Sequence, residues 1–296
     1  MNSLKKMAAV LLCAGLLTGC ASTKTDESSQ QSDTSSAAES DTDNNTEGTL
    51  LYQSERMNIR YTGQSSDDYY IYLNFKAENR TDGQLILAAD DIAVNDAMID
   101  PFLYAPVDSG QTKTVQMEFS KAELEELGIE ALGCVEFSFF ITDGSSSDGL
   151  ERSEIITLDV GESSSPERAK GAVIYDSNGL KITYLGMEPS DSTEACVTFD
   201  IQNDMGENIR IDVRDVYIDG TAVTAELYHP ISDGKYRVCN MYFWEEGVLL
   251  EDSKTLEFEL GAFDPETLDS ILETGTLTVD LQSMYEPEAE TTKAAE

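Results

Sequence analysis

Few residues of this chain have the types and spacing that catalysis or metal binding requires. The only histidine in 296 residues is His229, so the sequence contains no Ser/His/Asp or Cys/His set for nucleophilic catalysis. No CxxC pair or glycine-rich phosphate loop is present, and the carboxylate-rich segments 90–96 (DDIAVND) and 212–220 (DVRDVYIDG) lack the residue order of an EF-hand. We therefore predict that the protein is not an enzyme and holds no metal or cofactor. We expect His229 to be a surface turn residue, and Asp91 and Asp215 to bend strands.

Aromatic residues supply the candidate binding surface. In segment 236–244 (YRVCNMYFW), alternate side chains should point inward with Met241, and the others should point outward. The outward set is aromatic, which is unexpected on an acidic surface. Such a stripe is either buried against another domain or a covering loop, or it is a platform for a protein or a cell-wall glycan. The candidate residues are Tyr217, Tyr236, Tyr242 and Trp244.

The first twenty residues have the composition of an export signal. Lys5 and Lys6 precede an apolar run, 7–17, which is too short to span a membrane stably. The segment 17–20 (LTGC) resembles the lipobox of bacterial lipoproteins. This resemblance implies cleavage after residue 19 and attachment of diacylglycerol to Cys20, which would anchor the protein on the outer face of the cell membrane. The alternative is an ordinary secretory signal.

Charge and composition restrict the partners. The chain has 57 acidic and 19 basic residues, a formal net charge of −38, so nucleic acid and anionic surfaces should be repelled. Segment 20–48 contains almost no residue that could be buried, and it is predicted to be a disordered acidic tether. Residues 286–296 form a second acidic, disordered end by the same argument.

The cysteines do not predict a disulfide framework. Loss of the signal and lipidation of Cys20 leave three thiols, so at least one of them is unpaired. Alternation places Cys239 inward and Cys196 outward, a geometry that disfavours a bond between them. We predict no disulfide in the folded part.

Two segments of the chain are similar to each other. The octapeptide LYAPVDSG at 103–110 is followed by LYHPISDG at 227–234, an offset of 227 − 103 = 124. Other apolar and asparagine positions match at the same offset, among them Asn79 with Asn203 and Met117 with Met241. A period this long indicates tandem domains rather than a short-repeat solenoid. The outward aromatic positions of 236–244, namely 236, 242 and 244, have no aromatic counterpart in the first copy.

Most segments in both copies alternate with a period of two, as expected for half-buried strands. We predict an all-β fold of two tandem antiparallel immunoglobulin-like β-sandwiches, each with one short helix. The octapeptides are expected to be corners, with Leu103 and Leu227 in the core. The first helix would begin at Ser120 and the second at Asp264. The predicted divisions are 1–19 signal, 20–48 tether, 49–160 first domain, 161–170 linker, 171–285 second domain and 286–296 tail.

The chain resembles small immunoglobulin-like domains of unknown function carried by Gram-positive lipoproteins, in which an xxPGK turn precedes a strand. Segments 106–111 (PVDSGQ) and 230–235 (PISDGK) are longer versions of that turn. The predicted function is that of a lipid-anchored surface protein that acts as a non-enzymatic binding or display module. The alternative is a structural spacer or an accessory subunit of a membrane complex without its own ligand.

Overall fold

The computed structural model describes residues 48–145, 149–162, 166, 168–188, 195–244 and 250–283. The predicted signal peptide, the lipidation site Cys20, the acidic tail and nearly all of the tether lie outside the described residues. Within the described part, no helix is long and apolar enough to cross a membrane.

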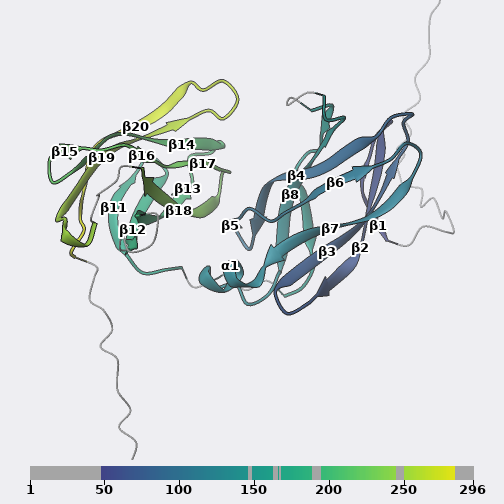
Figure 1. The fold of residues 1–296 in the computed structure, drawn as a ribbon, viewed down its shortest axis with the longest axis horizontal. Helices are drawn as coiled ribbons and strands as arrows, with labels where there is room; N and C mark the ends of the chain where they lie inside the picture. The colour runs from purple at the N-terminus through teal and green to yellow at the C-terminus, as the bar shows by residue number, and fades with distance from the viewer. Residues whose placement is uncertain are drawn as a thin grey trace, which may run out of the picture. The chain divides into compact units, whose positions relative to one another are not determined.

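The described chain is almost entirely β-structure, which confirms the predicted fold class (Figure 1). In the first half, one sheet contains β1 (Thr49–Gln53), β2 (Met57–Ser66), β3 (Tyr70–Asn79) and β7 (Thr112–Ser120). It packs against strands β4 (Leu85–Val94), β5 (Ala97–Met98), β6 (Tyr104–Val107), β8 (Cys134–Thr142), β9 (Glu151–Arg152) and β10 (Ile156–Asp159).

The second half repeats this arrangement. One group of strands contains β11 (Ala172–Ser177), β12 (Leu180–Glu188), β13 (Cys196–Asn203), β16 (Ala225–Glu226) and β18 (Lys235–Phe243). The facing sheet contains β14 (Ile209–Ile218), β15 (Thr221–Ala222), β17 (Tyr228–Ile231), β19 (Thr255–Phe263) and β20 (Ser270–Asp280). The described helical segments are α1 (Lys121–Glu126) and the 3-10 turn η1 (Leu250–Asp252).

Alternation along the strands builds a separate hydrophobic core in each half. The buried rings of Phe75, Phe137 and Phe139 contact one another in the first core, with centroids 5.0 to 6.0 Å apart. Phe199 packs between Tyr184 and Phe258 in the second core. Such aromatic pairs add about 0.5–1.5 kcal/mol to the stabilisation that burial itself provides.

One buried asparagine joins the two sheets of each half. Nδ2 of Asn79 donates to the carbonyls of Val107 (2.9 Å) and Gly83 (2.7 Å), and its Oδ1 accepts from the N–H of Thr81 (2.9 Å). Asn203 makes the same three bonds 124 residues later, to Ile231, Glu207 and Met205. Both asparagines are almost fully buried. Each therefore gives a hydrogen-bond donor to a carbonyl of the octapeptide strand, Val107 or Ile231, which would otherwise be buried without a partner.

Asp91 and Asp215 bend their strands, as predicted. Their φ angles are 52° and 48°, in the left-handed region, and the pairing register of β4 with β8 and of β14 with β19 shifts at these residues. Aspartate tolerates this conformation better than most residues do, since its short side chain can form local hydrogen bonds.

The octapeptides form short strands that end in tight turns. Pro106 and Pro230 lie inside β6 and β17, one residue before the end of each strand. Both are edge strands: β6 pairs with β4, and β17 pairs with β14. Proline is tolerated at an edge because its missing N–H has no partner there. Gly110 and Gly234 have φ angles of 65° and 72°, and the two leucines are buried, as predicted.

The first predicted helix is confirmed, and the second was wrong. Ser120 caps α1 by accepting from the N–H of Glu123 (3.4 Å), and Leu124 is buried beneath it. In the second half, Asp264 accepts from the N–H groups of Glu266 and Thr267, but these bonds close a single turn. The chain then continues as β20, because Leu277 and Val279 alternate into the core with the period of a strand.

The asparagine bridges lead to a stability prediction. Asn79→Ala should lower the free energy of unfolding by about 2–4 kcal/mol, since buried carbonyls lose their donor. Chemical denaturation measures this change. Asn74→Ala, on the outward face of the same strand, is the matched control and should cost less than about 1 kcal/mol. Equal losses in the two variants would contradict the bridging role of Asn79.

Candidate functional site

The four predicted aromatic residues do not form one stripe. Tyr236 and Tyr242 lie in β18 and Trp244 directly follows it, whereas Tyr217 lies in β14 of the facing sheet. Alternation had indicated which side chains point out of the sandwich, but it contains no information on which of the two sheets a strand joins. Tyr217 is exposed on a different surface, so its assignment to the stripe was wrong.

Tyr236 is buried, so its assignment to an exposed surface was also wrong. It is 8% exposed and packs in the hydrophobic core of the first half. Its N–H donates to the carbonyl of Asp96 (3.1 Å), and the Arg168 guanidinium carbon lies 4.4 Å from the centroid of its ring. Burial raises the pKa of Tyr236 to about 12. For this residue, the alternative of burial against the other domain is correct.

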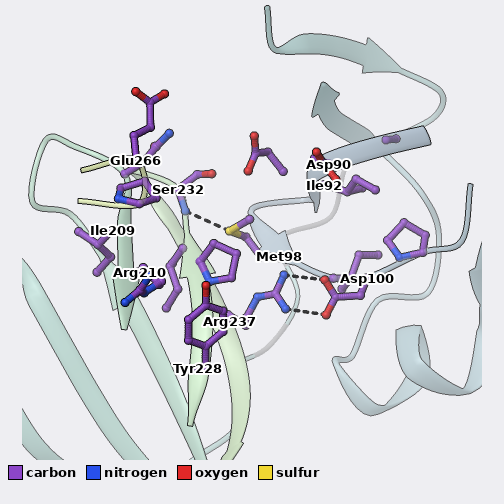
Figure 2. A pocket seen from close by; sticks show the side chains of 18 of the residues that line it. Asp90, Ile92, Met98, Asp100, Ile209, Arg210, Tyr228, Ser232, Arg237 and Glu266 are labelled. Atoms are coloured by element: carbon purple, nitrogen blue, oxygen red, sulfur yellow. Dashed lines mark hydrogen bonds and ion pairs between the residues drawn. The ribbon is translucent and has the colours of Figure 1, made fainter. Parts of the chain in front are cut away.

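Tyr236 belongs to a joint between the two halves, which we define as residues 96–100, which include β5, together with residues 232–237. Strand β5 pairs in parallel with β18, so one hydrogen-bonded sheet includes strands from both halves. Arg237 donates two hydrogen bonds to Asp100 (2.6 and 2.9 Å) (Figure 2). Lys235 forms ion pairs with Asp96 (2.8 Å) and Glu136. The Met98 sulfur accepts from the N–H of Ser232 (3.0 Å).

None of these joint side chains is repeated at the offset of 124. In the first half, the counterparts of Lys235, Tyr236 and Arg237 are Gln111, Thr112 and Lys113. In the second half, the counterparts of Asp96, Met98 and Asp100 are Gly220, Ala222 and Thr224. The signal that could have located the joint was therefore present, because residues found in only one copy concentrate there.

His229 is not a surface turn residue. It lies in β17, half-buried, and its Nδ1 lies 3.3 Å from Nη1 of Arg237. A guanidinium can only donate, so this contact is a hydrogen bond when the Nδ1 carries no proton. Burial, and then the charge of Arg237, lower the pKa of the imidazole, with smaller opposing effects from Asp100 and Glu226.

Two of the exposed aromatic side chains, Phe102 and Trp244, lie at or beside the same pair of cross-strand positions in the two halves. Trp244 is 59% exposed, and Tyr242 beside it is half-buried and pairs across the strands with Glu226. In the first half, Phe102 is 63% exposed, and it pairs with Glu118, which pairs with Tyr72. Because 226 − 124 = 102 and 242 − 124 = 118, these are the same positions of the fold. Sequence analysis missed Phe102 because it lies outside the regular alternation of a strand.

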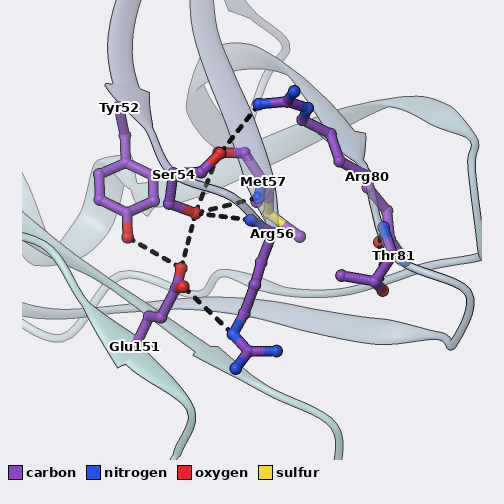
Figure 3. A network of polar contacts seen from close by, with 8 residues as sticks. Tyr52, Ser54, Arg56, Met57, Arg80, Thr81 and Glu151 are labelled. Carbon is purple, nitrogen blue, oxygen red and sulfur yellow. Dashed lines mark hydrogen bonds and ion pairs between the residues drawn. The ribbon is translucent and has the colours of Figure 1, made fainter.

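A polar network at the other end of the first half is structural. The Glu151 carboxylate accepts from Ser54 Oγ (2.7 Å) and Tyr52 Oη (3.0 Å), and it pairs with Arg56 (3.2 Å) (Figure 3). Ser54 Oγ also accepts from backbone N–H groups of its own turn. These contacts connect the β1–β2 turn to β9, and Arg56 pairs with the carboxylate that accepts from Ser54.

The described thiols and carboxylates show no reactive arrangement. None of the three described cysteines is part of a disulfide, and Cys196 is buried although alternation placed it outward. Burial raises the pKa of Cys239 to about 12, so this thiol is protonated at neutral pH. In the part of the chain that the structure describes, no group of three or more His, Cys, Asp or Glu side chains is placed to hold a metal ion.

Comparisons with known proteins add little. No family model and no curated protein matches the chain. The solved structure of the YadV chaperone is 12% identical, covers 76% of this chain and 100% of its own, and has a TM-score of 0.25.

The joint leads to a prediction about pH. The folded-state pKa of His229 is lowered, so the unfolded chain binds more protons near pH 6.5, and stability is lost as the pH falls below that value. This single group contributes at most about 1.4 kcal/mol per pH unit. Thermal unfolding between pH 7.5 and 5 should show a smaller decrease for His229→Gln than for the unmodified chain. Parallel pH profiles of the two proteins would exclude His229 as the source.

Proposed function

We propose that this chain is a lipid-anchored protein of the outer face of the cell membrane that binds a partner without catalysis. The export signal and the LTGC segment ending at Cys20 support the anchor. The lack of a nucleophile-base pair or metal group among the described residues is compatible with binding, and it carries no part of the proposal.

The observation that carries the proposal is the pair of exposed aromatic surfaces, which we define as Tyr72 and Phe102 in the first half and Tyr242 and Trp244 in the second. In each half an aromatic residue and a carboxylate pair across the same two positions of the fold, with the two members exchanged: Phe102 with Glu118, and Glu226 with Tyr242. The fold does not require these rings, because each aromatic of one copy is replaced by a non-aromatic residue in the other. Exposed aromatics of this kind are typical of binding sites.

The partner should be a protein or a cell-wall glycan. Both classes use aromatic contacts, whereas the net charge of −38 disfavours nucleic acid.

A second candidate is a structural spacer or an accessory subunit without a ligand. The buried position of Tyr236 favours it, since one of the four predicted aromatics stabilises the contact between the halves. Trp244 and Phe102 have no such role in the described structure, and for this reason we prefer the binding module.

Trp244→Ala tests the binding surface. It should weaken capture of wall fragments or membrane extracts by about 2 kcal/mol, which is the scale of an interface hot spot. The melting temperature should remain nearly unchanged, because an exposed ring contributes little to the core. Tyr217→Ala, an exposed aromatic on the facing sheet, is the control. A large loss of stability with unchanged capture would support the spacer instead.

Cys20→Ala tests the anchor. The variant should remain unlipidated and be processed poorly, because the lipid is attached through the thiol. Metabolic labelling with a fatty acid and the mass of the mature N-terminus measure both effects. Normal labelling of the variant would refute lipidation at Cys20 and favour an ordinary secretory signal.

A further inference from the structure

A cleft of about 740 Å³ lies beside the joint, between β4 and the β14–β17 pair (Figure 2). Its size is within the range of sites for small ligands. It is separate from the exposed aromatic surfaces, as none of their residues lines it. Its two walls carry opposite charge, and its floor is apolar.

Arg210 provides the positive wall. Its guanidinium carbon lies 4.9 Å from the ring centroid of Tyr228 and 5.7 Å from that of Phe263, so the side chain is held between aromatic rings. Its nearest carboxylate oxygen within the described structure belongs to Asp212, at 4.0 Å, beyond hydrogen-bond distance. Its Nε is buried and has no partner among the described atoms. The chain has three times as many acidic as basic residues, so a cation without a carboxylate at hydrogen-bond distance is unexpected.

The opposite wall keeps an excess of negative charge. Asp90 and Asp91 share one guanidinium, that of Arg152, at 2.6 and 2.9 Å. Two carboxylates against one cation leave one net negative charge. Burial raises the pKa of Asp90, Arg152 opposes this effect, and the charge of Asp91 adds to it, so a further cation at this wall would be favourable.

A third arginine does not alter this balance. Arg237 lines the cleft, but its two hydrogen bonds to Asp100 neutralise it. Its Nε is nevertheless buried without a partner, in a side chain that is only 6% exposed. Partly or fully exposed side chains supply the accessible apolar surface of the cleft: Ala89, Pro101, Tyr228, Pro230 and Pro265. Below them lie the buried side chains of Ile92, Met98, Ile99, Ile209 and Ile231.

We propose that this cleft binds a short peptide with free ends and small apolar side chains, its carboxylate at Arg210 and its ammonium group at Asp90 and Asp91. A carboxylate gives Arg210 a hydrogen-bonded ionic partner, which Asp212 at 4.0 Å does not provide, and a guanidinium binds this group in a planar, two-point geometry. The apolar floor accommodates the side chains between the two ends.

Other ligand classes fit less well. A polyanion would meet Asp90, Asp100 and Glu266 at the rim. The hydroxyl groups of a neutral oligosaccharide would donate hydrogen bonds to the carboxylates, but the sugar would bring no negative charge to Arg210. The dipolar arrangement therefore selects a ligand that carries both charges.

Titration calorimetry of the full chain in detergent tests the proposal with tetra-L-alanine as the probe. The unmodified peptide should bind, and affinity should fall at least tenfold when its C-terminus is amidated or its N-terminus acetylated. Arg210→Gln should cause the same loss for the unmodified peptide and little additional loss for the amidated one, since both changes remove the same contact. Comparing the peptides on the unmodified protein tests the charges even if a variant folds poorly.

Arg214→Gln is the matched control. Arg214 lies on the same strand and against the same ring of Phe263 (4.7 Å), but it pairs with Glu273 and does not line the cleft. It should leave the affinity unchanged, as should Trp244→Ala, which separates this site from the exposed aromatic surfaces. Equal affinity for the three peptides, no binding of tetra-alanine, or an equal effect of Arg210→Gln and Arg214→Gln would overturn the proposal. Tighter binding of chitohexaose than of tetra-alanine would assign the cleft to a glycan and also overturn it.

Discussion

The contact between the two halves depends on the bidentate pair of Arg237 with Asp100. Arg237 is almost fully buried, and a buried guanidinium without an acceptor would destabilise the structure by several kcal/mol. The hydrogen bonds and charge of Arg237 outweigh the desolvation of Asp100, which acts in the opposite direction, and keep the pKa of this carboxyl below its usual range. The pair therefore stays ionised at any physiological pH. It lies beside the single backbone pairing of β5 with β18, and the side chains of both halves around this pairing line the dipolar cleft.

Much of the fold follows from local chemistry that a sequence displays directly. Gly110 and Gly234 occupy conformations that favour glycine, Asp91 and Asp215 tolerate positive φ, and Ser120 accepts the N–H bond that begins a helix. Each of these depends on a residue and its immediate neighbours. The wrong prediction of a helix at Asp264 also came from a local signal, since this residue does cap one turn. The alternation of Leu277 and Val279 into the core then outweighs that signal, and the chain continues as a strand.

The candidate site was predicted less well, because it depends on which edges and sheets come together. Alternation correctly placed Met241 in the core and Trp244 outside it. It could not show that the outward side of Tyr236 would be covered by β5, or that β14 and β18 belong to different sheets. Both facts are set by contacts between residues far apart in the chain. Comparing the two copies was the most informative approach, since Tyr236, Trp244 and Phe102 all occur in one copy only, although the comparison does not distinguish a joint from a binding surface.

The unrepeated joint also limits how copies of this fold can associate. The contact joins two different edges, so it is a head-to-tail (heterologous) contact. If every copy of the fold carried both edges, further copies would add one after another and form a filament. Here the edge that would continue the series, β7, has Thr112 and Lys113 in place of Tyr236 and Arg237. The turn that would continue it at β15 has Ala222 and Thr224 in place of Met98 and Asp100. The same differences that make this joint specific therefore disfavour a second joint of this kind at either of these two edges.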